Sequence, residues 1–251
     1  MIDYNVTING LDVKANYSEE AVNNIFTPLL KKLTGLQQEK GRRILVMLAA
    51  PPGAGKSTLV SFLEKLSKET EGVAEIQTIG MDGFHRRQEY LTSHTTVRDG
   101  ETIPMVKIKG APETFDLDLF KERIKKCLSE KKCGWPVYDR TLHNPVDNVI
   151  TITKDIVILE GNYLLLNEPG WDELKSFADY TISVTADENM LRDRLIARKA
   201  LSGNSIEDAT AFVDYSDMVN VKTCLTKSAK ADLILQVLGT SDDRCDYVVV
   251  K

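Results

Sequence analysis

Short apolar runs alternate with segments of helical spacing along most of the chain. From residue 43 onward the apolar runs are ILVMLAA, EIQTIGM, DIVILEG, ADYTISV and ADLILQV, with helical patterns from about 56 and near 116–131. The runs are apolar on both faces, which is typical of strands in a parallel sheet that helices cover on each side. The pattern predicts an α/β fold with a parallel sheet flanked by helices. One segment, from about 92 to 112, shows neither pattern, and we expect a long loop or an excursion from the fold there, of a length that is more often functional than not.

The first forty residues follow a different pattern. Residues 3–17 alternate between apolar and polar around Asn9-Gly10, which predicts a hairpin with a tight turn. Ser18 then precedes a helical stripe that indicates core packing and leaves a contact with a second subunit as the alternative. The stripe consists of Val22, Ile25, Phe26, Leu29, Leu30 and Leu33. We interpret residues 1–40 as a hairpin and helix extension packed on a core of residues 41–251.

The composition and charge argue against nucleic acid and membranes as binding partners. With 251 residues, of which 42% are hydrophobic, the chain can bury a full core. A net charge of −5 and a pI near 5.4 give no broad basic surface for nucleic acid or an anionic membrane. The longest apolar run, 44–50, is too short to span a bilayer, and the four cysteines lack metal-site spacing. We expect a cytoplasmic protein that binds neither nucleic acid nor a membrane, and we leave a homo-oligomer open.

The sequence LAAPPGAGKSTLV joins an apolar run to a helical pattern through a glycine-rich turn. This context is that of a P-loop, in which backbone N–H groups and a helix N-terminus hold phosphate oxygens. Lys56 would reach the β- and γ-phosphates, and Ser57 would offer a hydroxyl to Mg²⁺. The residues expected to bind the nucleotide phosphates are Gly53, Ala54, Gly55, Lys56, Ser57 and Thr58. Ala50 stands where the motif usually has its first glycine, and its side chain is small enough for a strand end.

Two acidic residues also follow apolar runs. Asp82 comes after EIQTIGM and Glu160 lies in VILEG, so both fall at the carboxyl ends of predicted strands, where open α/β sheets bind ligands. Beside a bound nucleotide, Asp82 can accept the proton of an attacking hydroxyl, and Glu160 can hold Mg²⁺ directly or through water. The alternatives are a helix cap or turn for Asp82 and a buried, hydrogen-bonded acid for Glu160.

Kinases, GTPase switches and ATP-driven motors all contain P-loops, so other features must distinguish them. The chain contains neither the NKxD nor the DxxG motif of a GTPase. DIVILEGNY carries a single carboxylate at its end, whereas motors tend to place adjacent Asp and Glu there. These differences favour a kinase, and the alternative is a P-loop NTPase that regulates a protein partner through its nucleotide state.

Six segments together carry a family resemblance: PPGAGKST, MDGFH, GAPETFDLDLF, WPVYDRTLHNP, VILEGNYLL and DRLIARKALSGNS. Over about residues 43–238 the chain resembles the superfamily of phosphoribulokinase, uridine kinase and pantothenate kinase, which are P-loop small-molecule kinases. Within it, the chain is most similar to bacterial nucleoside-kinase-like or fructose-transport-system kinase-like members. The resemblance implies that Asp82 is the catalytic base, that Glu160 lies near the metal, and that the PVYDR segment lines the acceptor site.

The same resemblance implies a lid at about 190–205 that closes over ATP. Arg194 and Arg198 share a face of the predicted helix and would stabilise the transferred phosphoryl group, with surface ion pairing as the alternative. Beside Asp82, the residues expected to contact the acceptor are His85, Tyr138, Arg140 and His143. The expected function is transfer of the γ-phosphate of MgATP to a hydroxyl of a small metabolite, such as a sugar, sugar phosphate, hydroxy acid or nucleoside-like molecule.

Overall fold

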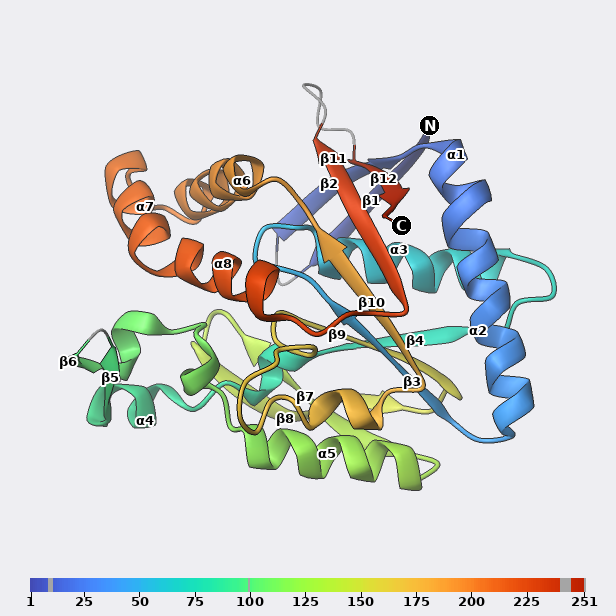
Figure 1. Ribbon diagram of the computed structural model, residues 1–251, viewed down its shortest axis with the longest axis horizontal. Coiled ribbons are helices and arrows are strands. Elements are labelled where there is room, and N and C mark those ends of the chain that lie inside the picture. Colours follow the sequence, from blue (N-terminus) through green and yellow to red (C-terminus); the bar gives the residue numbers. More distant parts are fainter. Residues whose placement is uncertain (9–10, 99, 240–244, 251) are drawn as a thin grey trace.

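Figure 1 shows the computed structural model, which describes residues 1–8, 11–98, 100–239 and 245–250. Its main element is an eight-stranded sheet with the strand order β1-β2-β12-β11-β10-β3-β9-β4. In chain order the strands are β1 (Ile2–Ile8), β2 (Leu11–Tyr17), β3 (Ile44–Ala49), β4 (Ile76–Gly80), β9 (Ile156–Gly161), β10 (Tyr180–Thr185), β11 (Leu233–Gly239) and β12 (Cys245–Val249). Strands β11, β10, β3, β9 and β4 run parallel, which confirms the predicted parallel sheet.

Helices cover both faces of this sheet. They include α1 (Glu19–Ala21), α2 (Thr27–Lys40), α3 (Lys56–Glu69), α4 (Gln88–Ser93), α5 (Leu117–Ser129), α6 (Glu188–Leu201), α7 (Ile206–Phe212) and α8 (Met218–Lys227). Alternate side chains of β3 belong to two separate buried clusters. Ile44, Val46 and Leu48 pack with residues of α2 and α3, while Leu45 and Met47 pack with residues of α5. Burial on both faces explains why the strand is a continuous apolar run.

The N-terminal hairpin extends the central sheet. Strands β1 and β2 pair antiparallel, and β2 also pairs with β12. Tyr17 stacks on Phe62 of α3 with ring centroids 4.2 Å apart, which ties the hairpin to the helix that follows the glycine-rich turn. The predicted N-cap is confirmed, because Ser18 Oγ accepts a hydrogen bond from the Ala21 amide, and the helical stripe packs in the core. The predicted turn at residues 9–10 lies outside the described residues.

Of the two alternatives for the segment from 92 to 112, the structure shows the excursion and not an irregular loop. A hairpin and two 3₁₀ turns occupy it: β5 (Thr95–Arg98), β6 (Glu101–Pro104), η3 (Met105–Ile108) and η4 (Pro112–Thr114). Gly100, at φ +82°, supplies the left-handed turn conformation that the hairpin needs. Met105 and Ile108 are buried, so the end of the segment packs against the rest of the protein.

A second small sheet and three helices surround the carboxyl ends of the parallel strands. The small sheet pairs β7 (Cys133–Asp139) with β8 (Asn144–Ile152), and the 3₁₀ turn η2 (Met81–Phe84) follows β4 directly. In Figure 1 the helices α6, α7 and α8 lie together at the end of the sheet toward which β3 and β10 point. Among the described residues, no helix has both the length and the apolar character needed to cross a membrane.

Candidate active site

The glycine-rich turn after β3 has the backbone of a phosphate-binding loop. Gly53 and Gly55 have φ values of +83° and +79°, and α3 begins at the next residue, Lys56. Such a turn directs backbone N–H groups inward, and the N-terminus of α3 adds its positive dipole end. A Cβ on Gly53 would lie 3.1 Å from the Leu191 carbonyl oxygen, so α6 packs directly on this loop. The turn therefore suits an anion such as a nucleotide phosphate.

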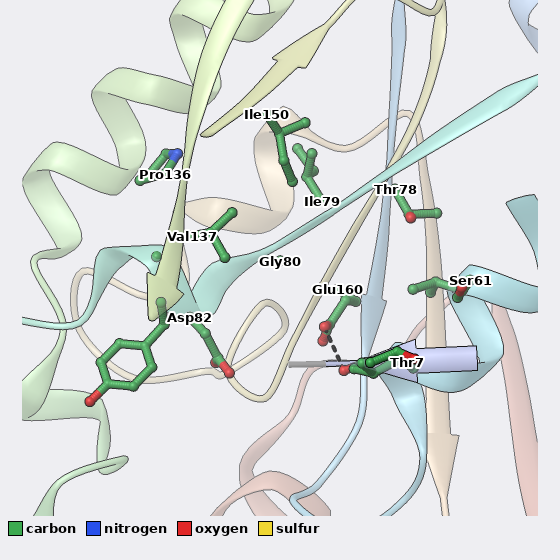
Figure 2. Close-up of a pocket in the computed structure, with 15 residues that line it drawn as sticks. Thr7, Ser61, Thr78, Ile79, Gly80, Asp82, Pro136, Val137, Ile150 and Glu160 are labelled. Carbon is green, nitrogen blue, oxygen red and sulfur yellow. Dashed lines mark hydrogen bonds between the residues drawn. The ribbon is translucent and has the colours of Figure 1, made fainter. Parts of the chain in front are cut away.

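Glu160 lies beside the start of α3. Its Oε1 accepts a hydrogen bond from Ser57 Oγ at 2.8 Å, shown as a dashed line in Figure 2. Burial raises the pKa of Glu160, and the Lys56 charge opposes this shift. The described residues contain no group of three or more His, Cys, Asp or Glu side chains that could hold a metal ion. The Ser57 hydroxyl and the Glu160 carboxylate still fit Mg²⁺, which prefers oxygen ligands and usually completes its shell with water and substrate phosphate.

Asp82 is positioned by close packing of η2 against β7. A Cβ on Gly83 would collide with the Pro136 carbonyl oxygen, so only glycine permits this approach. Trp135 Nε1 donates a hydrogen bond to the last carbonyl of β4 at 2.8 Å, which holds the strand end in place. Asp82 lies inside η2, whose N-cap is Gly80, and the N-cap of the next helix α4 is Arg87, so Asp82 is the N-cap of neither helix.

Asp82 borders two cavities. The smaller one, about 340 Å³ and shown in Figure 2, is also lined by Ser57 and Glu160. Figure 2 shows the carboxylates of Asp82 and Glu160 directed toward the same space. The larger cavity, about 510 Å³, lies on the side of α6 and α8. Asp82 therefore lies between the oxygens of Ser57 and Glu160 on one side and the larger cavity on the other. This position suits a base that acts on an attacking hydroxyl.

The larger cavity collects the residues expected at the acceptor. Its lining includes Asp82, His85, Tyr138, Arg140 and His143. Lys56 lines the same cavity, which therefore joins the phosphate-binding loop to the acceptor residues. Arg198 also lines it, whereas Arg194 is not among its lining residues. We refer to it below as the acceptor cavity.

His85 is held in this cavity by aromatic contacts. Its ring stacks on Phe115 with centroids 4.0 Å apart and meets Tyr138 edge-on at 5.2 Å. Burial lowers the pKa of His85 to about 4, and the Asp82 charge only partly opposes this, so the imidazole is neutral near physiological pH. In the described structure its buried Nδ1 has no hydrogen-bond partner. A neutral ring with an unpartnered nitrogen can bind a polar group of the acceptor.

The acceptor cavity is also lined by residues that the sequence does not single out, among them Lys109, Asn162, Lys199, Phe212, Asp217 and Asn220. Lys109 Nζ donates hydrogen bonds to Gln88 Oε1 at 2.7 Å and to the His143 carbonyl at 3.1 Å. Desolvation lowers the pKa of Lys109. Lys109 directly precedes the segment GAPETFDLDLF, and Asn162 lies inside VILEGNYLL, so their places in or beside these segments are a signal that could have found them. Lys199 lies inside the quoted segment DRLIARKALSGNS, next to Arg198. Phe212, Asp217 and Asn220 come from α7, η6 (Val213–Asp217) and α8, where the sequence shows only helical spacing.

Helix α6 brings basic side chains to the same cavity. Part of the Arg198 side chain is exposed to solvent. Desolvation by the protein atoms around its guanidinium lowers the pKa of Arg198, and the Arg140 charge lowers it further. Lys199 Nζ lies 3.5 Å from the centre of the Phe212 ring, a contact that ties α6 to α7. The helix ends at Leu201, and Gly203 follows at φ +98°. Arg198 is thus placed to act on a group in the cavity.

Comparison with known proteins identifies the family. The sequence profile of the Phosphoribulokinase / Uridine kinase family matches residues 45–243. The chain belongs to this family. YggC of Escherichia coli (strain K12) is 41% identical to it over 92% of this chain and 94% of that protein. The Schizosaccharomyces pombe protein C227.14, provisionally named a uridine kinase, is 33% identical over 78% of this chain and 84% of its own length.

A solved structure agrees with the family assignment. The crystal structure of a Silicibacter sp. TM1040 protein, provisionally named a fructose transport system kinase, matches with a TM-score of 0.70 and 29% identity. The match covers 82% of this chain and 98% of that one. Both the predicted P-loop kinase fold and the resemblance are confirmed. As a member of this family the chain is an ATP-dependent phosphotransferase with a hydroxyl acceptor.

Proposed function

We propose that the protein transfers the γ-phosphoryl group of MgATP to a hydroxyl of a small metabolite that also carries a negatively charged group. The acceptor cavity supports this proposal, because the P-loop lysine, a candidate base and several other basic side chains line it together. The basic residues in its lining are Lys56, Lys109, Arg140, Arg198 and Lys199, and the acidic ones are Asp82 and Asp217. Sugar phosphates and hydroxy acids suit this excess of positive charge better than neutral sugars or nucleosides do.

The residues divide the chemistry among them. Asp82 accepts the proton of the acceptor hydroxyl as its oxygen approaches the γ-phosphorus. Lys56 neutralises charge on the phosphates, and Arg198 adds a second cation from α6. A Mg²⁺ ion bound by Ser57 and Glu160 would supply further charge neutralisation at the phosphate oxygens.

On the acceptor side, two cations can bind the charged group. The Arg140 guanidinium offers two parallel N–H donors to a carboxylate or phosphate, and Lys109 adds a compact charge. Lys109 is already held by Gln88 and the His143 carbonyl, so little side-chain freedom is lost on binding. Tyr138 and His143 are then placed to hydrogen-bond hydroxyl groups and to direct one of them toward Asp82.

ADP release with a panel of sugars, sugar phosphates, hydroxy acids and nucleosides tests the proposal. Fructose and uridine belong in the panel because the names of two relatives mention them. We expect an anionic acceptor to stimulate release, and Arg140→Ala to raise its KM about 10- to 100-fold, the cost of a lost charged hydrogen bond. The KM for ATP should change little. Arg87→Ala is the matched control, because Arg87 is exposed and does not line the acceptor cavity.

Two results would contradict parts of this proposal separately. Equal losses for neutral and charged acceptors in the Arg140 variant would remove the anion-binding role and leave the kinase function intact. ADP release that no small molecule stimulates, but that depends on a protein partner, would instead support the regulatory NTPase alternative.

A further inference from the structure

One part of the acceptor cavity has no role in the chemistry above. Asp217 ends the π-helical turn η6 (Val213–Asp217), and Asn220 lies three residues later in the first turn of α8. Residues three apart share a helix face, and both of these line the cavity. They reach it from a different part of the fold than Asp82, which lies in η2 after β4.

Asn220 is buried without a complete set of partners. Only 2% of the residue is exposed, and in the described chain its Oδ1 has no hydrogen-bond partner. Its Nδ2 lies 3.8 Å from the place of a Cβ on Gly110, another residue of the cavity lining. An unsatisfied buried polar atom costs about 1 to 3 kcal/mol, and folded proteins contain few of them. A hydrogen-bond donor on a ligand in the cavity would satisfy this oxygen.

Asp217 presents a carboxylate to the same cavity. Among the described residues its side chain forms no hydrogen bond and no ion pair. Burial raises the pKa of Asp217, while the charges of Lys199 and then Arg198 oppose the shift. The two carboxylate oxygens are therefore available to hydrogen-bond donors from a ligand.

The charges around the pair restrict what such a ligand group can be. Asp217 would repel a phosphate or carboxylate, and the basic side chains of the lining would repel an ammonium group. Neutral donors meet neither objection, and in the sugar phosphates and hydroxy acids favoured above the neutral donors are hydroxyl groups. Building on the proposed function, we infer that Asp217 and Asn220 bind neighbouring hydroxyl groups of the acceptor other than the one that is phosphorylated. The pair selects polyols, and Lys109 and Arg140 hold the charged end of the same molecule.

The competing role for Asp217 is structural. Its charge acts on Arg198 and Lys199, so it could serve only to hold these cations on α6. Because α6 packs on the P-loop through Leu191, that role predicts a change in nucleotide affinity and in the turnover of every acceptor. Recognition of a hydroxyl predicts instead a loss confined to acceptors that carry the additional hydroxyl.

The test measures binding of small probes to the full chain loaded with MgADP, by titration calorimetry. Two matched pairs of anions differ by a single hydroxyl: glycerate with lactate, and ribose phosphate with deoxyribose phosphate. We expect the parent protein to bind the member with the extra hydroxyl about 5- to 100-fold more tightly, because its absence leaves a buried acceptor unsatisfied. Asp217→Ala and Asn220→Ala should each bring this ratio closer to one without changing the affinity for MgADP. Asp217→Asn, which keeps one oxygen acceptor, should retain part of the ratio.

Asp214→Ala is the matched control. Asp214 lies on the same turn, is exposed, and pairs with Arg192 at 2.6 Å, so its removal should leave the ratio unchanged. Equal affinity for both members of each pair in the parent protein, or no binding of any of the four probes, overturns the inference. The inference is also overturned if Asp217→Ala lowers the affinity for MgADP and lowers the affinities for both members of each probe pair by the same factor. That result would favour the structural role.

ADP release recorded with the same probes separates this inference from the proposed function. Discrimination between the pairs in binding, without ADP release from any acceptor of the wider panel, contradicts the proposed function alone. Release with lactate as efficient as with glycerate contradicts the inference alone, because lactate offers only the hydroxyl that is phosphorylated.

Discussion

The phosphate-binding half of the site and the acceptor-binding half are built in opposite ways. The phosphate half comes from one continuous stretch, residues 50–58, with Glu160 added from the neighbouring strand β9. Two of its polar groups already pair, through the hydrogen bond from Ser57 to Glu160. The acceptor half is assembled from η2, β7, α6, α8 and residues near 109. Buried atoms without partners occur there, on His85, Asn162 and Asn220.

Under the proposed function, the two ligands account for this difference. Every nucleoside triphosphate presents the same phosphates, so a short turn with fixed backbone donors can bind them. Acceptors differ in shape and charge, and only side chains brought together from distant segments can distinguish among them. Substitutions in the phosphate half should therefore impair transfer to every acceptor. Those in the acceptor half should mainly change which acceptor is used.

Lys56→Ala should produce the largest loss and tests the first half of the comparison. Because Lys56 would neutralise charge that grows as the phosphoryl group moves, we expect kcat to fall about 10³- to 10⁵-fold, the range seen for a comparable cation in phosphoryl transfer. The loss should be similar for every acceptor in a steady-state assay. Lys65→Ala, an exposed position on the same helix, should behave as the parent protein. Unchanged turnover in the Lys56 variant would contradict the P-loop assignment.

Asp82→Asn should have the next largest effect, at the border of the two halves. Asparagine keeps the shape of the side chain and loses the proton acceptor, so turnover should fall about 10²- to 10⁴-fold. MgATP affinity, measured with a fluorescent nucleotide, should stay close to that of the parent protein. An unfolded variant, or one that loses nucleotide while it still binds the acceptor, would return Asp82 to a structural role.

Arg198→Ala should slow transfer by about 10²-fold, the contribution of one donor directed at a developing charge. Arg194→Ala should cost less, because Arg198 lines the acceptor cavity and Arg194 does not. Single-turnover transfer at saturating ATP and acceptor measures both effects without interference from product release. Equal effects of the two substitutions would show that α6 moves during the reaction far enough to bring Arg194 to the phosphates.

The contrast between a contiguous phosphate half and an acceptor half assembled from distant segments also determines how much of the site the sequence could predict. The phosphate half was predictable because its residues are adjacent and lie between a strand pattern and a helix pattern. Asp82 and Glu160 could be placed together because β4 and β9 run parallel and end at the same edge. Asp217 and Asn220 could not be found, because helical spacing alone does not tell which side chains face a cavity. For the segment from 92 to 112 the sequence could not distinguish a loop from an excursion, because the burial of Met105 and Ile108 depends on tertiary packing.

The smallest expected effect is on the pH dependence of stability and concerns His85. This residue belongs to the acceptor half, and its burial there determines its protonation. Its pKa of about 4 in the folded protein lies below the ordinary value of 6.5, chiefly through desolvation, with Lys109 and Arg140 acting in the same direction and Asp82 against it. Between these two values the unfolded chain binds a proton that the folded protein does not. The free energy of unfolding should therefore fall as the pH drops through this window, by up to about 1.4 kcal/mol per pH unit.

Burial raises the pKa of Glu160 and of Asp217. Protonation of these two groups therefore increases the free energy of unfolding as the pH falls, opposite to the effect of His85. The free energies of unfolding of the parent protein and of His85→Phe must therefore be compared at each pH. The phenylalanine ring of this variant can keep the stack on Phe115 and cannot be protonated. In urea unfolding, we expect the variant to lose less stability than the parent between about pH 7 and about pH 5. Parallel curves would mean that water reaches the His85 ring in solution. The acceptor half would then be hydrated like an ordinary surface, and its unpartnered atoms would no longer indicate a ligand.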